Sequence, residues 1–65
     1  MNIQEIADYI VQRRKTLAVS QARVAELSGV SVHTLSNLET ATGNVTLSTL
    51  LKVCNILGLE VKVGV

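Results

Sequence analysis

A three-residue pattern recurs three times in this 65-residue chain and predicts where its helices begin. An apolar residue is followed directly by a hydroxyl residue, and a second apolar residue stands four positions beyond the hydroxyl. The hydroxyl can cap free backbone N–H groups, while the apolar pair packs together as a hydrophobic staple that fixes the direction of the helix. The three sets are Val19, Ser20 and Val24; Val30, Ser31 and Leu35; and Val45, Thr46 and Leu50.

These three starts predict helices over about Gln21 to Ser28, Val32 to Glu39 and Leu47 to Leu57. Gly29 and Gly58 follow the first and the last of them, at the position where a left-handed residue often ends a helix. Within the last helix the apolar stripe comprises Leu47, Leu50, Leu51, Cys54 and Leu57.

A further helix is predicted near the N-terminus, where Asn2 and Glu5 resemble a capping box. The apolar residues that follow have helical spacing, and we expect their stripe to be buried. The stripe comprises Ile3, Ile6, Ala7, Ile10, Val11 and Leu17.

The C-terminal segment 59–65 changes from a helical period to strict alternation, which predicts a β-strand. Its apolar positions are Leu59, Val61, Val63 and Val65. A single strand cannot satisfy its own backbone groups, and no second strand is predicted elsewhere in the chain. Antiparallel pairing with the same strand of a second copy would solve this and make a homodimer. The alternative is a frayed tail.

The composition is that of one small globular domain spanning residues 1–65, because 48% of the residues are apolar and the net charge is only +1. A chain of this length buries only about 60% of its unfolded surface, so oligomerisation would add needed stability. No apolar run is long enough to span a bilayer, and acids stand where a secretory signal would be basic. We therefore expect a cytoplasmic protein without a membrane partner.

Nothing in the chain predicts an enzyme, a cofactor or a metal site. Cys54 is the single cysteine, so neither an internal disulfide nor a cysteine cluster for a metal can form. Its place in the apolar stripe indicates a small core residue. His33 has no nucleophile or acid placed by the sequence to make it a catalytic base.

The segment from Ser20 to Glu39 predicts two short helices joined by a tight turn, the shape of a DNA-reading helix-turn-helix. At helical spacing Leu35 and Leu38 point to one side of the second helix, toward the core. The opposite face is polar and suits a major groove, although it could equally be an ordinary solvated face. It presents Val32, His33, Ser36 and Asn37.

Phosphate contacts are predicted beside this unit. Gln21 and the free N–H groups at the start of its helix suit an anion, although Gln21 could also be a plain first-turn residue. Four of the six basic residues lie within eleven positions, namely Arg13, Arg14, Lys15 and Arg23. They indicate either a local basic patch or favourable charges at the end of a helix.

The segment from Arg14 through Leu57 resembles the Cro and lambda-repressor (XRE-type) helix-turn-helix family. The matching residues are Ser20, Gln21, Ala25, Gly29, Val30, Ser31, Leu35, Leu38 and Glu39. The resemblance implies an all-α, lambda-repressor-like bundle of four main helices, to which the predicted C-terminal strand is added. It also implies a structural ion pair between Arg14 and Glu39, which ties the first helix to the end of the recognition helix.

More narrowly, SNLETATGNVTLSTLLKVCNILGLEVKV is similar to the corresponding part of HipB-type antitoxins. Those proteins bind double-stranded operator DNA as dimers, repress their own operon and bind a HipA-type kinase toxin. The resemblance implies DNA contacts from Gln21, Arg23, Ser31, Val32, His33, Thr34, Ser36, Asn37 and Asn44, with Arg13 or Lys15 as further phosphate ligands. A stand-alone phage- or plasmid-type repressor, or a protein-interaction adaptor with the same fold, are the alternatives.

The chain departs from the family at two places. Ala18 stands where a glycine is usual after the first helix, so this alanine must adopt a costly positive φ or the turn must change shape. The segment ETATGNVT carries no lysine or arginine, whereas many members have basic residues there. We therefore expect fewer phosphate contacts and a shallower salt dependence of DNA binding.

Overall fold

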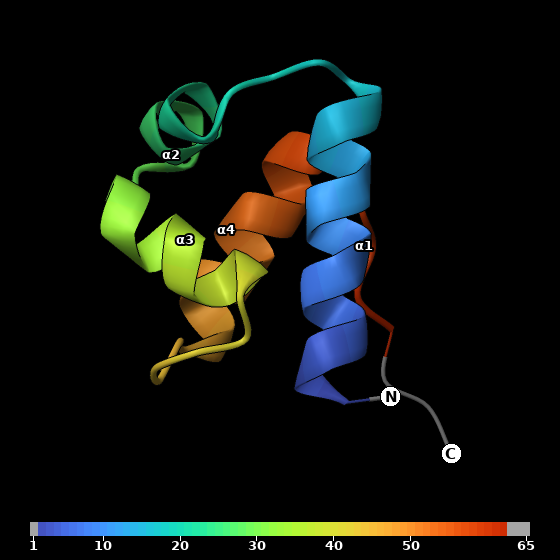
Figure 1. Ribbon diagram of the computed structural model, residues 1–65, viewed down its shortest axis with the longest axis vertical. Coiled ribbons are helices and arrows are strands. Elements are labelled where there is room, and N and C mark those ends of the chain that lie inside the picture. The colour runs from blue at the N-terminus through green and yellow to red at the C-terminus, as the bar shows by residue number, and fades with distance from the viewer. Residues whose placement is uncertain (1, 63–65) are drawn as a thin grey trace.

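The computed structural model describes residues 2–62 and contains four α-helices in that range. They are α1 (Ile3–Thr16), α2 (Gln21–Ser28), α3 (Val32–Glu39) and α4 (Leu47–Leu57). In Figure 1, α2 and α3 lie together on one side of the molecule and α1 stands on the other. Helix α4 packs against α1 and α2, and α3 contacts both of these helices as well. The predicted bounds of the last three helices are confirmed.

Each helix begins at the residue that the sequence predicted as its cap. The side chains of Asn2, Ser20, Ser31 and Thr46 all accept a hydrogen bond from the backbone N–H three residues later. The staple residues Val19, Val30 and Val45 pack against the core cluster that contains their partners. Local hydrogen bonding and local apolar contacts therefore set the starts of these short helices.

All four helices end in the same hydrogen-bonded turn, a Schellman motif. In α2 the N–H of Val30 donates to the carbonyl of Ala25 and the N–H of Gly29 to that of Glu26. In these four turns the left-handed residues are Ala18, Gly29, Ala41 and Gly58, with φ of 56°, 73°, 57° and 71°. Ala18 thus adopts the costly positive φ, and the alternative of a reshaped turn is not seen. Ala41 also has a positive φ, which the sequence did not predict.

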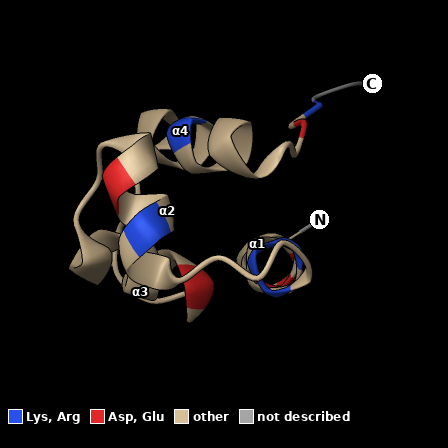
Figure 2. Cartoon of the chain, turned by 90° about the horizontal axis from the view of Figure 1, so that it is seen from above, with Lys and Arg blue, Asp and Glu red and all other residues tan. Residues whose placement is uncertain are grey.

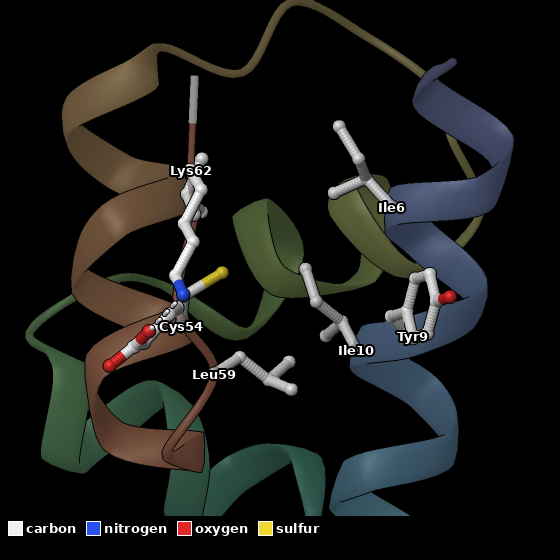
Figure 3. Close-up of a pocket in the computed structure, with 8 residues that line it drawn as sticks. Ile6, Tyr9, Ile10, Cys54, Leu59 and Lys62 are labelled. Carbon is white, nitrogen blue, oxygen red and sulfur yellow. Dashed lines mark ion pairs between the residues drawn. The ribbon is translucent and has the colours of Figure 1, made fainter. Parts of the chain in front are cut away.

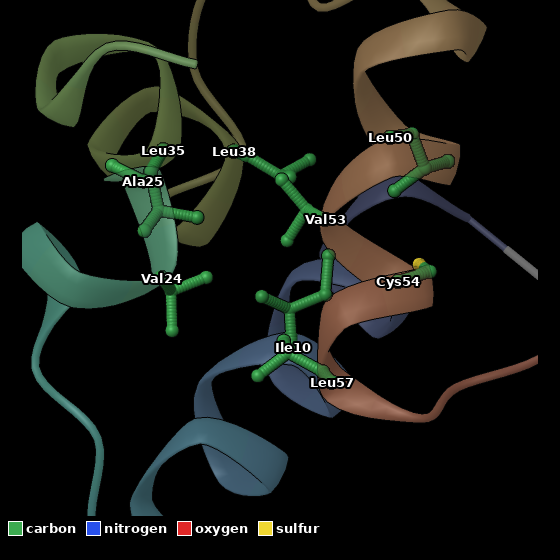
Figure 4. Close-up of a cluster of buried hydrophobic side chains, with 9 residues drawn as sticks. All are labelled: Ile10, Val24, Ala25, Leu35, Leu38, Leu50, Val53, Cys54 and Leu57. Atoms are coloured by element: carbon green, nitrogen blue, oxygen red, sulfur yellow. The ribbon is translucent and has the colours of Figure 1, made fainter. Parts of the chain in front are cut away.

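The core lies where the four helices meet, and Figure 4 shows side chains from each of them pointing into it. Its members are Ile10, Val24, Ala25, Leu35, Leu38, Leu50, Val53, Cys54 and Leu57. The predicted apolar stripes are only partly buried. Ile3 and Leu17 at the ends of α1, and Leu47 and Leu51 on α4, are exposed. Ile3, Leu17 and Leu47 stand at helix ends, where fewer neighbouring helices can cover a side chain.

The predicted strand is not formed within the described chain, because residues 59–62 have no regular secondary structure. Val63 and Val65 lie outside the described residues. A strand is defined by pairing with a neighbour, so one protomer alone cannot display the predicted intersubunit pairing. Within residues 2–62, no helix is both long enough and apolar enough to cross a membrane.

Candidate nucleic-acid interface

Helices α2 and α3 form a helix-turn-helix whose turn depends on Gly29. This glycine has a φ of 73°, and an added Cβ would meet no atom within 4 Å. The backbone conformation, and not a lack of space, therefore favours glycine here. Ser31 follows in an extended conformation and its Oγ accepts from the N–H of Thr34 at 3.0 Å. The turn and the cap together set the direction in which α3 projects.

The core face of α3 is as the sequence predicted, whereas the opposite face is fully exposed only at its N-terminal end. Leu35 and Leu38 are 0% and 1% exposed, so they hold the helix to the core. Val32 and His33 are exposed at the N-terminal end of α3, next to the exposed cap Ser31. The predicted groove readers Thr34, Ser36 and Asn37 are half-buried. The most solvent-exposed part of this face is therefore the start of α3, at Val32 and His33.

The side chain of Asn37 has neighbours on α3 and in the following loop that the sequence did not predict. Its Nδ2 lies 3.5 Å from Nε2 of His33, and its Oδ1 lies 3.4 Å from Oγ1 of Thr42. The backbone of the following loop passes close by, since a Cβ added to Gly43 would lie 3.2 Å from Asn37 Nδ2. Asn44, predicted to touch the DNA backbone, lies exposed in this loop.

The Arg14–Glu39 ion pair is present and has two-pronged geometry. Arg14 Nε donates to Glu39 Oε2 at 2.7 Å and Arg14 Nη2 donates to Oε1 at 3.0 Å. The two side chains are only 16% and 4% exposed. Arg14 Nη1 also donates to the carbonyl of Val19 at 3.0 Å, so the same guanidinium braces the turn before α2. Helix α3 is thereby fixed at its C-terminal end to α1.

The hydrogen-bonded network of Arg14, Gln21 and Glu39 lowers the pKa of the Glu39 carboxyl below its ordinary value. Burial acts to raise this pKa, but the hydrogen bonds from Arg14 and Gln21 and the charges of Arg14 and Lys15 outweigh it. The hydrogen bond to Glu39 in turn raises the pKa of Arg14. Glu39 is therefore ionised at neutral pH, and the brace carries full charge on both partners.

Gln21 takes part in this network, which sequence reasoning missed. Its Nε2 donates to Glu39 Oε1 at 3.0 Å, so the amide predicted to meet phosphate already has an internal partner. An amide NH₂ group has two donors, and the second remains for a ligand. The contact spans α2 and α3, and no short-range sequence signal could have found it.

The run of basic residues does not form an open patch. Arg14 is paired with Glu39, and Arg23 forms an exposed ion pair with Glu26 one turn further along α2. Arg13 Nε donates to the carbonyl of Leu57 at 2.8 Å, at the end of α4, where sequence reasoning had placed no contact. Figure 2 shows the basic residue on α2 and none on α3. Lys15 is exposed.

Cys54 is a buried core residue and is not placed as an activated nucleophile. Cys54 is 4% exposed in the core, and burial raises the pKa of its thiol, the opposite of what an activated nucleophile needs. No group of three histidine, cysteine, aspartate or glutamate side chains that could hold a metal ion is found among residues 2–62. The exposed start of α3, at Ser31, Val32 and His33, projects from a helix that is held to the core and to α1, and such a surface can bind a partner molecule.

The comparisons with known proteins agree with this geometry. A family model described as helix-turn-helix matches residues 10–63. Two solved structures, one described as "MDT Protein" and one as "Structure of HipA-HipB-O2-O3 complex", each match with a TM-score of 0.88 and 25% sequence identity. Each match covers 98% of this chain and 90% of the other. No curated protein matches the chain. The chain therefore belongs to the XRE-type helix-turn-helix family of DNA-binding transcription regulators.

Proposed function

We propose that this chain is a HipB-type antitoxin, a cytoplasmic homodimer that binds operator DNA, represses its own operon and binds a HipA-type kinase toxin. Two observations support the proposal. Ser31, Val32 and His33 at the start of α3 are exposed, while the rest of the helix is held by Leu35, Leu38 and Glu39. The likeness to a chain of a HipA–HipB complex extends over 98% of this protein, beyond the helix-turn-helix itself.

In the proposed complex, Ser31, Val32 and His33 enter the major groove first, because they are the most exposed part of α3. Hydroxyl and imidazole groups can meet base edges, and the Val32 methyls suit a thymine methyl. Gln21 and Arg23 face the DNA backbone from the start of α2. Thr34, Ser36, Asn37 and Asn44 complete the contact surface from half-buried or loop positions.

A footprint and titration on the DNA upstream of its own gene test this proposal. A two-fold dimer should protect two half-sites spaced by about one helical turn or a multiple of it. With few free cations on this surface, the slope of log K against log salt should be shallow, about −4 for a dimer that makes four phosphate contacts. Binding no tighter than to random duplex at both low and high salt would end the repressor proposal.

The dimer is tested by removing residues 60–65 and keeping Leu59, which packs against the core. The shortened protein should sediment as a monomer and bind the operator more weakly, because the two half-sites lose their tether. A shortened protein that remains a dimer would place the interface elsewhere. Circular dichroism on the same samples checks that the four helices persist.

One observation favours the alternative of a protein-interaction adaptor. Three of the four basic residues near the helix-turn-helix already have internal partners, namely Arg13, Arg14 and Arg23. The double variant His33→Ala, Asn37→Ala separates the two functions. The repressor requires a large loss of operator affinity, whereas the adaptor requires unchanged DNA affinity and intact partner binding.

The antitoxin and the stand-alone repressor differ in their protein partner. Co-purification with the product of the neighbouring reading frame, followed by a kinase assay of that product, distinguishes them. The antitoxin should form a stable complex with a kinase-like protein. Operator binding without such a complex would leave the repressor and exclude the antitoxin.

A further inference from the structure

Arg13 crosses from the end of α1 to the end of α4. Its Nε donates to the carbonyl of Leu57, 44 positions away, at 2.8 Å, and the contact is partly buried. Leu57 is the last residue of α4. A helix C-terminus carries partial negative charge, so a guanidinium there makes a charge-assisted hydrogen bond.

The same guanidinium lies against the residue at which the C-terminal tail begins. Gly58 ends α4 with a φ of 71°, and a Cβ added there would lie 3.4 Å from Arg13 Nη2. The Schellman turn uses the carbonyls of Asn55 and Cys54, which accept from the N–H groups of Gly58 and Leu59. The Leu57 carbonyl, one residue before the tail turns away, is bonded to Arg13. Arg13 therefore holds the point at which the chain leaves α4.

The tail, residues 59–62, forms one wall of an apolar groove (Figure 3), and α1 forms the other. The groove has a volume of about 240 Å³ and is lined by Ile6, Tyr9 and Ile10 of α1, by Cys54 of α4 and by all four tail residues 59–62, of which Glu60 and Lys62 are charged. Tyr9 is 61% and Val61 39% exposed. Within the described chain no backbone hydrogen bond ties Glu60, Val61 or Lys62 to another residue. The tail thus presents an open backbone edge beside the groove.

A free tail of this kind loses conformational freedom when it pairs with another strand, and that loss opposes association. A contact that fixes the end of α4, from which the tail leaves, reduces this loss. The Leu57 carbonyl is the last helical acceptor before the tail, so a bond from α1 fixes the direction of the tail relative to the α1 wall of the groove.

We infer that Arg13 is a positioning residue for dimerisation: it anchors the start of the tail to α1 and so pre-orders the tail for pairing with the tail of a second copy. The inference rests on the homodimer of the proposed function. It also assigns Arg13 a role other than the phosphate contact that the family resemblance implied. Arg13 itself need not touch the second copy.

The test compares dimer dissociation constants of the full chain by sedimentation over a dilution series. Arg13→Met keeps the apolar stem of the side chain and removes the donor and the charge. Its dimer should dissociate about tenfold more readily, because the backbone freedom of about one more tail residue must then be lost on association. Arg13→Lys keeps the charge without the planar guanidinium, so it should lie between Arg13→Met and the wild type.

Lys15→Met is the matched control, because it removes an exposed positive charge two residues further along the same helix. It should leave the dimer constant within about twofold, as expected for exposed charges. All proteins are compared at a temperature where circular dichroism shows full helix content. If Arg13→Met is not fully folded there, Arg13→Lys provides the comparison.

A dimer constant for the Arg13 variants equal to that of the wild type would overturn the inference and leave the proposed homodimer intact. A shallower salt dependence of DNA binding with unchanged dimerisation would also overturn it, by making Arg13 a phosphate ligand. A wild-type protein that stays monomeric at all concentrations would remove the homodimer of the proposed function, and this inference with it. Weakened dimerisation with unchanged monomer helix content is the supporting result.

Discussion

Two arginine–glutamate pairs in this small protein have the same chemistry and different surroundings. Arg14 and Glu39 are 16% and 4% exposed and join α1 to α3, whereas Arg23 and Glu26 are 57% and 70% exposed on one face of α2. The buried pair has a second acceptor for Arg14 and a second donor for Glu39, supplied by Val19 and Gln21. The side chains of the exposed pair face solvent. Burial therefore makes the first pair a structural brace, while the second remains open to a ligand.

The helices that carry the two pairs also end differently. The buried pair lies on α1 and α3, which end at Ala18 and Ala41 with positive φ. The exposed pair lies on α2, which ends at Gly29. Left-handed backbone costs an alanine about 1–2 kcal/mol and costs a glycine little. The two helices joined by the buried pair are thus followed by strained alanines, whereas α2 is followed by an unstrained glycine.

The largest expected effect is the loss of one member of the buried pair. Glu39→Ala should lower the free energy of unfolding by about 3–5 kcal/mol, because Arg14 is left buried without its partner. Urea denaturation followed by circular dichroism measures this. Glu26→Ala is the matched control and should change stability by less than about 1 kcal/mol. Equal losses in the two variants would contradict the distinction between the pairs.

The contribution of Glu39 to the free energy of unfolding should decrease at acid pH. Because the pKa of Glu39 is lower in the folded than in the unfolded chain, its contribution to stability is complete above its ordinary pKa of 4.5. That contribution should fall as the pH drops from there through the folded pKa, where the carboxyl takes up a proton. Stability of Glu39→Gln, measured by denaturation from pH 6 to pH 3, should depend less on pH than that of the wild type. Parallel curves for the two proteins would show that other carboxyls dominate the acid response.

Smaller effects are expected at the strained helix ends. Ala18→Gly and Ala41→Gly should each raise the free energy of unfolding by about 1 kcal/mol, since glycine relieves the left-handed strain but adds freedom to the unfolded chain. Ala22→Gly, within α2, should instead lower it by about 1 kcal/mol. Thermal denaturation of the three variants checks the signs. If Ala18→Gly and Ala41→Gly both lower the free energy of unfolding, left-handed backbone strain does not destabilise these two turns.

Breaking the exposed Arg23–Glu26 pair should have the smallest effect on the free energy of unfolding, but it should change the affinity for operator DNA. Glu26→Gln releases Arg23 and removes a negative charge beside the predicted phosphate contact, so operator affinity should rise a few-fold at low salt and less at high salt. Unfolding free energy should stay within about 0.5 kcal/mol of the wild type. Titration of labelled operator at two salt concentrations tests this. Reduced affinity would show that the ion pair orients Arg23 for DNA.

The bounds of α2, α3 and α4 were predictable because caps, staples and Schellman turns are made by residues within about six positions of one another. The buried face of α3 followed from helical spacing alone, whereas spacing did not predict that Ser36 and Asn37 on the other face would be half-buried. The Arg14–Glu39 contact was predicted from the family resemblance, since no local pattern links residues 25 positions apart. Groove contacts by Ser31, Val32 and His33 stay a prediction, as does strand pairing by the C-terminal tail.

Local sequence thus determined where the helices begin and end and which side of each is apolar. Tertiary structure alone decided the partners of those polar side chains that reach another helix or loop. It placed Gln21 on Glu39, Arg13 on the last carbonyl of α4, and the loop at Gly43 against Asn37. It also left Leu47 and Leu51 exposed despite their helical spacing. The physical reason is that caps depend on neighbours along the chain, whereas the partner of a long polar side chain depends on which helices pack together.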